Sequence, residues 1–275
     1  MKKLWPLFIN TVILFIISQA FAKDNLQLRI NRWLEVRSIS GNVSYANAQT
    51  SQPARVGTRL KNVGESISTG KNSRTVLALD TGIGFINVAE NTQLRIQQLK
   101  KTSSGGSITD LQVLTGQVKL KLRRFTNQSS HLRIETPAGI TGVRGTEFGV
   151  SVQPSGKTGI ATLTGSVATT AQGQSVNVNK GFQSLVIPGE APTPPVPLRD
   201  DTKLDLLGIK DIGNGEAQIV GKVDPVNLVI LTNRPLNTDR NGNFDLKVPI
   251  PSDRLISVSV TTPLGKQKNY RLAVP

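Results

Sequence analysis

The sequence predicts an all-β protein with two domains, and three observations support this. Short segments that alternate apolar and polar residues follow one another from about residue 31 onward, separated by Gly, Asn, Ser and Thr. The composition is rich in Val, Ile, Leu and Thr and lacks long helix-forming blocks, which favours strands. A proline-rich segment divides the series of strands in two.

The N-terminus has the features of a secretory signal peptide. Two lysines precede an apolar stretch over residues 4–17, and an Ala-Phe-Ala cleavage site ends at Ala22. We expect a signal peptide over residues 1–22, cleavage after Ala22, and a mature protein in the periplasm or outside the cell. An uncleaved anchor is the alternative, although the stretch is short for a bilayer span. No second apolar run approaches that length, so we expect the mature chain not to be integral to the membrane.

The chain is strongly basic and contains no cysteine. Its formal net charge is +15, of which two lysines leave with the signal peptide. Because a basic exported protein attracts polyanions, we expect an envelope protein or an anionic wall or lipid polymer as partner, and no nucleic acid. The cations are scattered, so a merely solvated surface is the alternative; only KLKLRR, residues 119–124, forms a local cluster. Without cysteine, neither disulfides nor thiolate chemistry is available.

The first domain is expected over residues 23–187. Its clearest strands lie at 74–80, 83–89, 92–99, 110–122 and 131–137. Within 110–122 the alternation continues on both sides of Gly116, which predicts a bulge or bend there. An apolar-x-Gly-x-Val motif recurs with unequal spacing at 39–43, 114–118 and 163–167. We interpret these motifs as three similar strand corners and not as a solenoid array of fixed period.

A linker and a second domain follow. Residues 188–203 are rich in proline, which holds the chain extended and donates no ladder hydrogen bond. The remaining residues, 204–275, show another series of short strands with turns about every ten residues, which fits a small β-sandwich. This pattern resembles bacterial Ig-like modules.

The stretch TPAGITGVRGTEFGVSV, residues 136–152, is the main candidate site. It sets four glycines and the pair Arg144 and Glu147 into a strand-like run. A phosphate-binding loop would need a lysine and a helix after the glycines, and neither follows Gly145. The GVRG sequence also matches the GxxG loop of RNA-binding KH domains, but such loops lie between helices.

Catalysis would require a nucleophile with a base, a carboxylate pair or a metal cluster. His131 is the only histidine and has no His or Asp partner at a suitable spacing, so we interpret it as a structural or surface residue. No pair stands out among the 18 acidic residues. We therefore predict no enzyme activity, no catalytic residue and no cofactor, with an envelope hydrolase as the minor alternative.

We prefer to interpret this glycine-rich stretch as a corner between two strands. Glycine permits positive φ and close backbone approach, which a chain needs where it turns and re-enters a sheet. Arg144 and Glu147 flank Gly145, and we expect them to face each other as a charge-assisted pair. The predicted structural motif comprises Thr136, Pro137, Gly142, Val143, Arg144, Gly145, Thr146, Glu147 and Phe148.

A second stretch, TDRNGNFDLKV at residues 238–248, is faintly similar to a calcium-binding loop. Its potential oxygen ligands alternate at Asp239, Asn241, Asn243 and Asp245. The glycine comes at the fourth place of the loop, whereas a calcium loop needs it at the sixth. We therefore predict a hairpin turn at Asn241-Gly242 and no metal site, and leave calcium as the alternative.

Two segments together resemble the FecR domain. The first, VGTRLKNVGESISTGKNSRTVLALDTGIGFINVAENTQLRI, matches the opening of the family pattern at Gly57, Leu60, Gly64, Ile67, Thr69, Gly70, Ser73, Leu79, Asp80 and Gly82. The second, IETPAGITGVRGTEFGV, matches its closing VRGT-x-F motif, and the resemblance extends over residues 31–187. The chain departs from the family at Glu65, where Asp is usual, and at Thr81, which is inserted before Gly82.

The resemblance implies a solenoid-like or twisted β-sandwich fold. In the regulators that gave the family its name, an inner-membrane anti-sigma protein relays a signal from an outer-membrane receptor to a sigma factor. The cytoplasmic domain and transmembrane helix of that circuit are not recognisable here, so we do not carry sigma-factor control over. We expect a non-catalytic envelope binding or scaffold module. The alternative is a periplasmic component of a cell-surface signalling system of the iron-uptake type.

Overall fold

The computed structural model describes residues 32–80 and 82–275, and within this range the chain is all-β, as predicted. The predicted signal peptide, residues 1–22, lies outside the described residues. In the range that is described, no helix is long and apolar enough to cross a membrane. By their contacts, Arg32–Pro275 form one compact unit.

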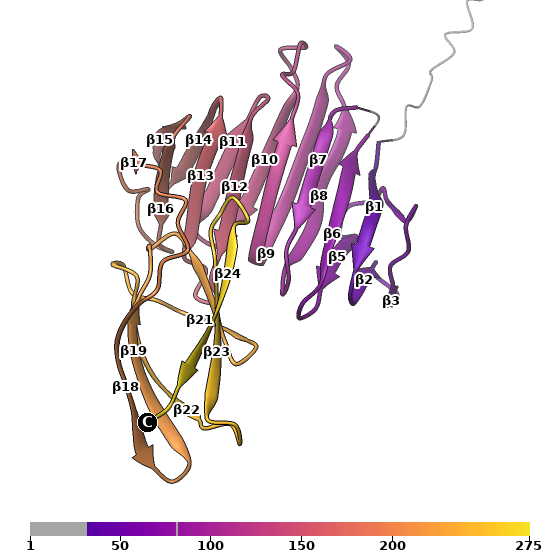
Figure 1. Ribbon diagram of the computed structural model, residues 1–275. Helices are drawn as coiled ribbons and strands as arrows, with labels where there is room; N and C mark the ends of the chain where they lie inside the picture. Colours follow the sequence, from indigo (N-terminus) through magenta and orange to yellow (C-terminus); the bar gives the residue numbers. More distant parts are fainter. Residues whose placement is uncertain (1–31, 81) are drawn as a thin grey trace, which may run out of the picture. The chain divides into compact units, whose positions relative to one another are not determined.

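The N-terminal part is a sandwich of two sheets that share one long strand, β9 (Figure 1). In spatial order, sheet A contains β4 (Arg59–Leu60), β1 (Leu34–Ser40), β6 (Arg74–Leu79), β7 (Gly84–Val88), β9 (Ser107–Leu122), β12 (Glu147–Val152), β13 (Thr158–Thr164), β16 (Phe182–Val186) and β17 (Val196–Pro197). Sheet B contains β3 (Ser51–Pro53), β2 (Val43–Ala46), β5 (Ser66–Thr69), β8 (Gln93–Lys101), β9, β10 (His131–Thr136), β11 (Gly139–Val143), β14 (Ser166–Ala171) and β15 (Gln174–Asn179). We call this part the N-terminal sandwich.

Strand β9 leaves sheet B and enters sheet A at Gly116. Thr115 still pairs with Gln93 of sheet B, whereas Gly116 pairs with Val152 of sheet A. Gly116 has φ +94, and a Cβ there would lie 2.5 Å from the Cα of Thr92. The bend predicted at Gly116 is therefore confirmed, and only glycine meets both conditions.

The other two apolar-x-Gly-x-Val motifs lie at equivalent places. Gly41 connects β1 of sheet A to β2 of sheet B, and Gly165 connects β13 of sheet A to β14 of sheet B. Both have φ +77. The prediction of three similar corners is confirmed, because each motif marks a crossing between the two sheets.

Alternate side chains of both sheets fill the space between them. Ile86, Leu120 and Phe148 of sheet A and Leu94 and Ile134 of sheet B are all fully buried in one apolar cluster. Burying an aliphatic or aromatic side chain of this size contributes roughly 1.5–3 kcal/mol. The period-2 patterning recognised in the sequence is therefore the pattern of this core.

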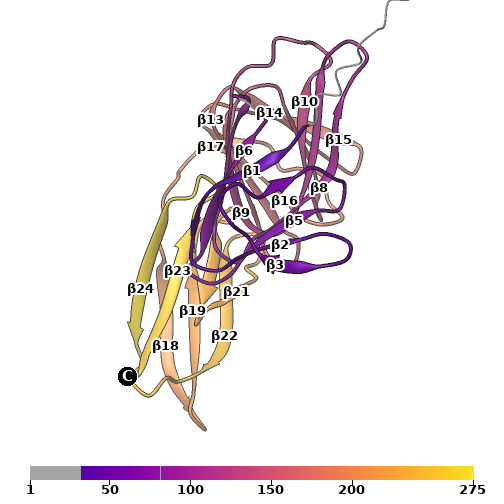
Figure 2. The same cartoon turned by 90° about the vertical axis from the view of Figure 1, so that its right-hand side faces the viewer.

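The C-terminal part is a smaller sandwich with its own core (Figure 2). One sheet contains β18 (Asp205–Gly213), β19 (Glu216–Lys222) and β22 (Asn243–Pro249), and the other contains β21 (Arg234–Leu236), β20 (Leu228–Leu231), β23 (Leu255–Thr261) and β24 (Gln267–Ala273). We call it the C-terminal sandwich. The predicted small sandwich is present, and its Ig-like classification stays a prediction.

The proline-rich segment lies along the edge strand β16. Val196 pairs with Gln183, and the N–H of Leu198 donates to the carbonyl of Gly181 at 2.8 Å. The hydroxyl of Thr193 accepts the N–H of Leu185 at 2.9 Å. The segment is thus extended but bonded, and the boundaries predicted for it at 188–203 stay a prediction.

The outer face of sheet A is covered where it meets the C-terminal sandwich. A Cβ on Gly149 would lie 1.8 Å from the carbonyl oxygen of Pro263, and one on Gly159 would lie 2.5 Å from that of Val226. The two glycines therefore allow the C-terminal backbone to approach the sheet. Ser151, on the same face, donates a hydrogen bond of 2.5 Å to the carbonyl of Val226. Strand β12 is consequently buried on both faces.

Candidate functional site: a basic rim at a strand corner

The glycine-rich stretch turns from β11 in sheet B to β12 in sheet A through residues 144–146. At its centre, Gly145 has φ +113, and a Cβ there would lie 2.2 Å from the Cα of Arg124. The carbonyl of Arg144 accepts the N–H of Phe125 at 3.2 Å. The carbonyl of Thr146 accepts the N–H of Leu122 at 3.0 Å. The corner is therefore bonded directly to the end of the KLKLRR segment.

The remaining motif residues hold the corner from both sides. Val143 and Phe148 are buried in the core on either side of the turn. The hydroxyl of Thr158 lies 3.0 Å from that of Thr136, which ends β10. Pro137 forms the tight turn between β10 and β11. Gly142 pairs with both neighbours of β11, and Thr146 is buried beside Gly165.

The predicted pairing of Arg144 with Glu147 is wrong. Glu147 lies on β12, opposite Lys121 of β9, and its Oε1 is 2.9 Å from the Nζ of Lys119. Arg144 donates instead to the carbonyl of Gln128, in the loop after β9. The turn at Gly145 explains why the two side chains do not meet. Arg144, before the turn, is directed toward that loop, whereas Glu147, after it, already belongs to β12 of sheet A.

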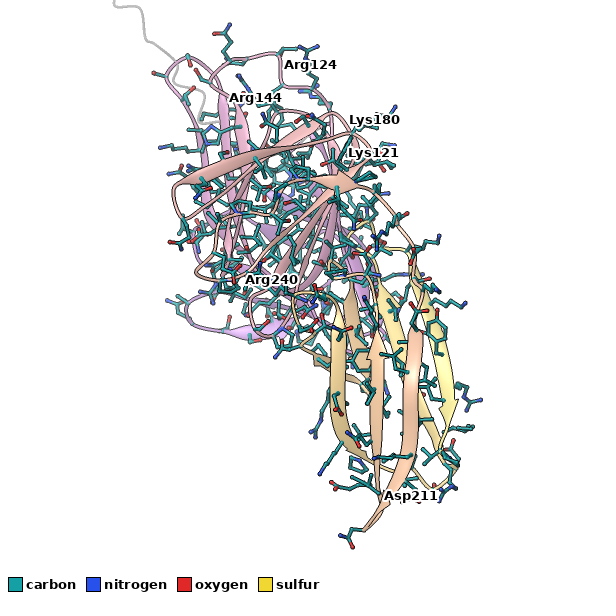
Figure 3. All side chains as sticks on the ribbon, turned by 90° about the vertical axis from the view of Figure 1, so that its left-hand side faces the viewer. Lys121, Arg124, Arg144, Lys180, Asp211 and Arg240 are labelled. Atoms are coloured by element: carbon teal, nitrogen blue, oxygen red, sulfur yellow. The ribbon has the colours of Figure 1, made fainter. Side chains whose placement is uncertain are left out.

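Five exposed cations surround this corner: Lys121, Arg123, Arg124, Arg144 and Lys180. We call them the basic rim; Figure 3 labels Lys121, Arg124, Arg144 and Lys180. The backbone N–H of Lys180 donates to the carbonyl of Gly165, and Gly165 packs against Thr146 of the corner. The end of β9, the corner itself and the loop at Lys180 therefore meet here. Sequence analysis recognised the KLKLRR cluster and Arg144 separately and missed Lys180, because only the sheet crossing brings them together.

The basic rim is poorly neutralised. Within the described part of the chain, Arg123, Arg124, Arg144 and Lys180 form no ion pair, and Lys121 is 4.0 Å from a carboxylate oxygen of Glu147. A pocket of about 570 Å³ lies between Arg124 and Arg144, lined also by Phe125, Thr126 and Gln128. Guanidinium groups bind carboxylates and phosphates with paired hydrogen bonds. The arrangement is therefore suited to binding an anionic group.

The histidine lies near the rim, beside an ion pair of Asp110 and Arg133. Its Nε2 is 3.7 Å from Asp110, whose carboxylate is held by Arg133 through bonds of 2.8 and 2.7 Å. Burial lowers the pKa of His131, and nearby cations including Arg144 act in the same direction against Asp110. Throughout residues 32–80 and 82–275, no three His, Asp or Glu side chains are grouped as a metal site would require.

The stretch at residues 238–248 forms a turn, but the predicted hairpin at Asn241-Gly242 is wrong. It connects β21 to β22, which belong to different sheets and do not pair with each other. The carboxylate of Asp239 accepts both backbone N–H groups of Asn241 and Asn243 at 2.8 Å, and the amide of Asn243 as well. Asp239 therefore caps its own loop. Asp245 is bonded to Gln218 on the neighbouring strand, away from this cap.

Comparison with known proteins identifies the domain that bears the corner. Residues 65–168 match a family model described as FecR protein. Over these residues the chain is similar to FecR proteins. The predicted resemblance is confirmed, and the matched range includes the corner and every rim residue except Lys180.

Solved structures show only distant similarity. Two crystal structures described as a "putative anti-sigma factor" from Parabacteroides distasonis ATCC 8503 align with TM-scores of 0.39 and 0.38 and identities of 14% and 13%. Each alignment covers 48% of this chain and 59% of theirs, less than two thirds of their length. A polysaccharide lyase aligns with a TM-score of 0.21 and 9% identity, over 88% of this chain and 40% of its own. No curated protein matches the chain. Similarity at this level supports no argument about function.

One of the two departures from the FecR pattern has a local explanation. Glu65, where Asp is usual, accepts the N–H groups of Lys61 and Asn62 at 2.6 and 3.2 Å. Its other oxygen accepts the side-chain amide of Asn62 at 2.7 Å. The longer side chain thus caps the turn before β5. The other departure, Thr81, lies outside the described residues.

Proposed function

We propose that the protein is a non-catalytic, exported FecR-domain component of a cell-surface signalling system, in which the basic rim binds an acidic surface of a partner protein. The FecR match favours this alternative over the envelope scaffold that we expected first. The observation that supports it most directly is the position of the rim. Cations surround the corner that carries the closing VRGT-x-F motif, and four of the five form no ion pair within the described residues.

The rigidity of the corner and the charge of the rim both favour binding of an acidic surface. The corner is fixed by core residues on both sides and by backbone hydrogen bonds to residues 122 and 125, so the rim cations project from an ordered frame. Clustered cations raise the local potential, which steers an acidic partner and speeds association at low ionic strength. Anionic wall or lipid polymers would be attracted by the same charge, and the experiment below separates them from a protein partner.

The test is genetic and uses matched charge reversals. Deleting the gene in its native host should change transcription of a receptor or sigma-factor operon, and the wild-type chain should restore it. A chain with Arg124→Glu and Arg144→Glu should fail to restore it. The control, with Lys210→Glu and Lys247→Glu on the C-terminal sandwich, should succeed, because both lysines are exposed and form no ion pair within the described residues.

The outcomes separate the two functions. Unchanged transcription together with a weakened envelope would favour the scaffold, and equal restoration by both double variants would reject the rim as the docking surface. As a non-catalytic protein, the purified chain should also leave envelope polysaccharides intact in a zymogram.

A further inference from the structure

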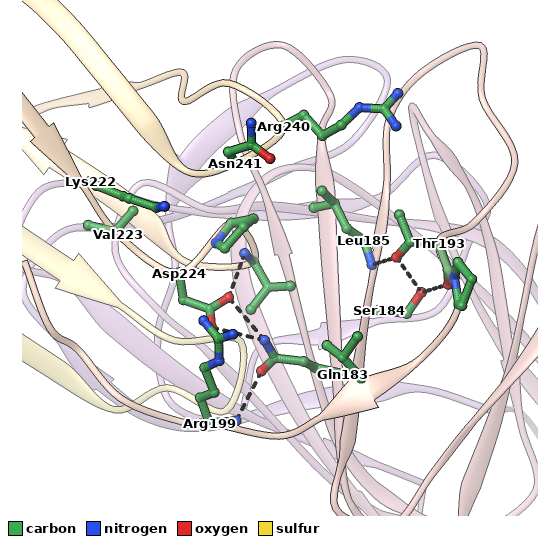
Figure 4. Close-up of a pocket in the computed structure, with 14 residues that line it drawn as sticks. Gln183, Ser184, Leu185, Thr193, Arg199, Lys222, Val223, Asp224, Arg240 and Asn241 are labelled. Atoms are coloured by element: carbon green, nitrogen blue, oxygen red, sulfur yellow. Dashed lines mark hydrogen bonds and ion pairs between the residues drawn. The ribbon is translucent and has the colours of Figure 1, made fainter.

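A second pocket, of about 510 Å³, lies away from the basic rim, where the edge of the N-terminal sandwich, the proline-rich segment and the C-terminal sandwich meet (Figure 4). Its apolar wall is formed by Leu185, Pro194, Val196, Val223, Pro225 and Val226. A volume of this size lies within the range of small-molecule sites, roughly 300–1,000 Å³.

The one carboxylate of this pocket is already satisfied. Asp224 is buried, and both of its oxygens lie 3.0 Å from the amide nitrogen of Gln183. It also accepts the N–H of Val226 at 3.2 Å, and Arg199 lies 3.6 Å away. Because these donors belong to the protein, Asp224 does not need a cationic ligand.

The other charged residues that line the pocket are all cations. Lys222 is exposed and has no ion-pair partner within the described residues, and the side chain of Arg199 is 67% exposed despite its contact with Asp224. Arg240 pairs with Glu190 at the surface. An anionic group that entered the pocket would thus find Lys222 and Arg199 with unused donors beside an apolar wall.

We propose that this pocket binds a small amphipathic organic anion. Its apolar part, about the size of one or two rings or a short acyl chain, would pack against Val196 and Val223, and its carboxylate or sulfonate would lie against Lys222 and Arg199. The inference goes beyond the proposed function, because it concerns a small molecule at a different place. Since the walls come from both sandwiches, the bound anion would also stabilise their contact.

The test is a fluorescence titration of the full chain with 1-anilinonaphthalene-8-sulfonate, whose rings and sulfonate have the required chemistry. Saturable binding of one probe per chain is expected. Lys222→Gln should weaken it about fivefold by removing one charge, and Val196→Glu should abolish it by placing a like charge in the apolar wall. Lys247→Gln and Val56→Glu are the matched controls, since Lys247 is an exposed lysine and Val56 is 66% exposed, both outside the pocket.

Displacement of the probe tests the chemical class. Octanoate should displace it at a concentration at least about fivefold lower than octanol, because only octanoate carries the anionic group. Equal displacement by the two compounds would overturn the anion site. Non-saturable binding, or equal loss in pocket and control variants of unchanged melting temperature, would overturn the pocket itself. None of these results depends on the basic rim, so the proposed function stands or fails separately.

Discussion

Strand β12 connects the basic rim to the interface with the C-terminal sandwich. Charged groups at the rim are exposed, whereas polar groups in the interface are buried and hydrogen-bonded. The basic rim lies next to the first residue of β12, and four of its five cations form no ion pair within the described residues. A few residues later it enters the interface with the C-terminal sandwich, where Gln153 bonds to Thr238 and Asn227 across the contact. In that interface the ammonium of Lys157 also donates to Thr238 and to the carbonyl of Asp239, both at 2.6 Å.

The difference shows which surface is part of the fold and which is open to a partner. Buried polar groups must be paired within the molecule, because an unpaired one costs about 1–3 kcal/mol. The interface meets that requirement, so the two sandwiches form one structural unit. The rim cations are exposed to water, so they need no carboxylate partner within the protein. They are therefore available to bind an external anion.

The largest effect is expected from Gly145→Val at the corner. The substitution combines a β-branched residue at φ +113 with a Cβ that would lie 2.2 Å from the backbone of Arg124. We expect a loss of about 3 kcal/mol or more in the free energy of unfolding, measured by urea denaturation. Gly173→Val is the control, since Gly173 has φ +71 but no atom within 4 Å of its Cβ position. Equal losses in the two variants would show that the close approach to Arg124 contributes nothing.

The next effect concerns the interface. Gly149→Ala would place a Cβ 1.8 Å from the carbonyl of Pro263 and so force the two sandwiches apart. We expect a loss of about 2 kcal/mol and faster proteolysis of the proline-rich segment. Gly142→Ala is the matched control on β11, because the nearest atom there is 4.0 Å away. If both variants resist protease like the wild type, the glycine is not what allows the close contact.

A smaller effect is expected from the buried ammonium of Lys157. Burial lowers the pKa of Lys157 to about 8, against the opposing influence of Asp239 and Asp224. Between that value and the ordinary 10.5, the unfolded chain holds the proton and the folded chain does not. The free energy of unfolding should therefore rise by about 1–3 kcal/mol from pH 8 to pH 10.5 and stay independent of this group below pH 8.

Comparison of wild type with Lys157→Met isolates this contribution, because other titrating groups cancel in the difference. Urea unfolding at pH 7.5 and pH 10 should show a larger rise in stability for the wild type. Lys247→Met, an exposed lysine with no ion pair in the described range, should behave like the wild type. The same increase in Lys157→Met would mean that Lys157 is not the responsible group.

The sequence predicted the features that depend on local chemistry. Alternation identified β6 to β10, and glycine at Gly41, Gly116 and Gly165 marked the crossings between sheets, because positive φ at these positions favours glycine whatever surrounds it. Strand β18 lies mostly exposed at a sheet edge and does not show a clean alternation, so its sequence does not delimit it. The hairpin predicted at Gly242 failed for a related reason, since a turn sequence does not reveal which sheet the next strand will join.

The candidate sites depended on contacts that no sequence spacing reveals. The pairing of Arg144 with Glu147 was inferred from their separation by three residues. Instead Glu147 binds Lys119, which lies on β9 two residues before Lys121, the residue directly opposite Glu147. The backbone of Lys180 bonds to Gly165 beside the corner, and Asp224 of the C-terminal sandwich bonds to Gln183 of β16. Each contact joins residues that are well separated in the sequence and thus required the three-dimensional structure.

The smallest effect on stability, and the clearest separation of the two regions, is expected from the rim itself. Arg124→Glu together with Arg144→Glu should change the free energy of unfolding by no more than about 0.5 kcal/mol, because both side chains are exposed and form no ion pair within the described residues. The same double variant should elute from a heparin column at a distinctly lower salt concentration than the wild type. Lys210→Glu with Lys247→Glu changes the net charge equally and should shift elution less. Equal shifts would show that total charge, and not the rim, governs binding to anions.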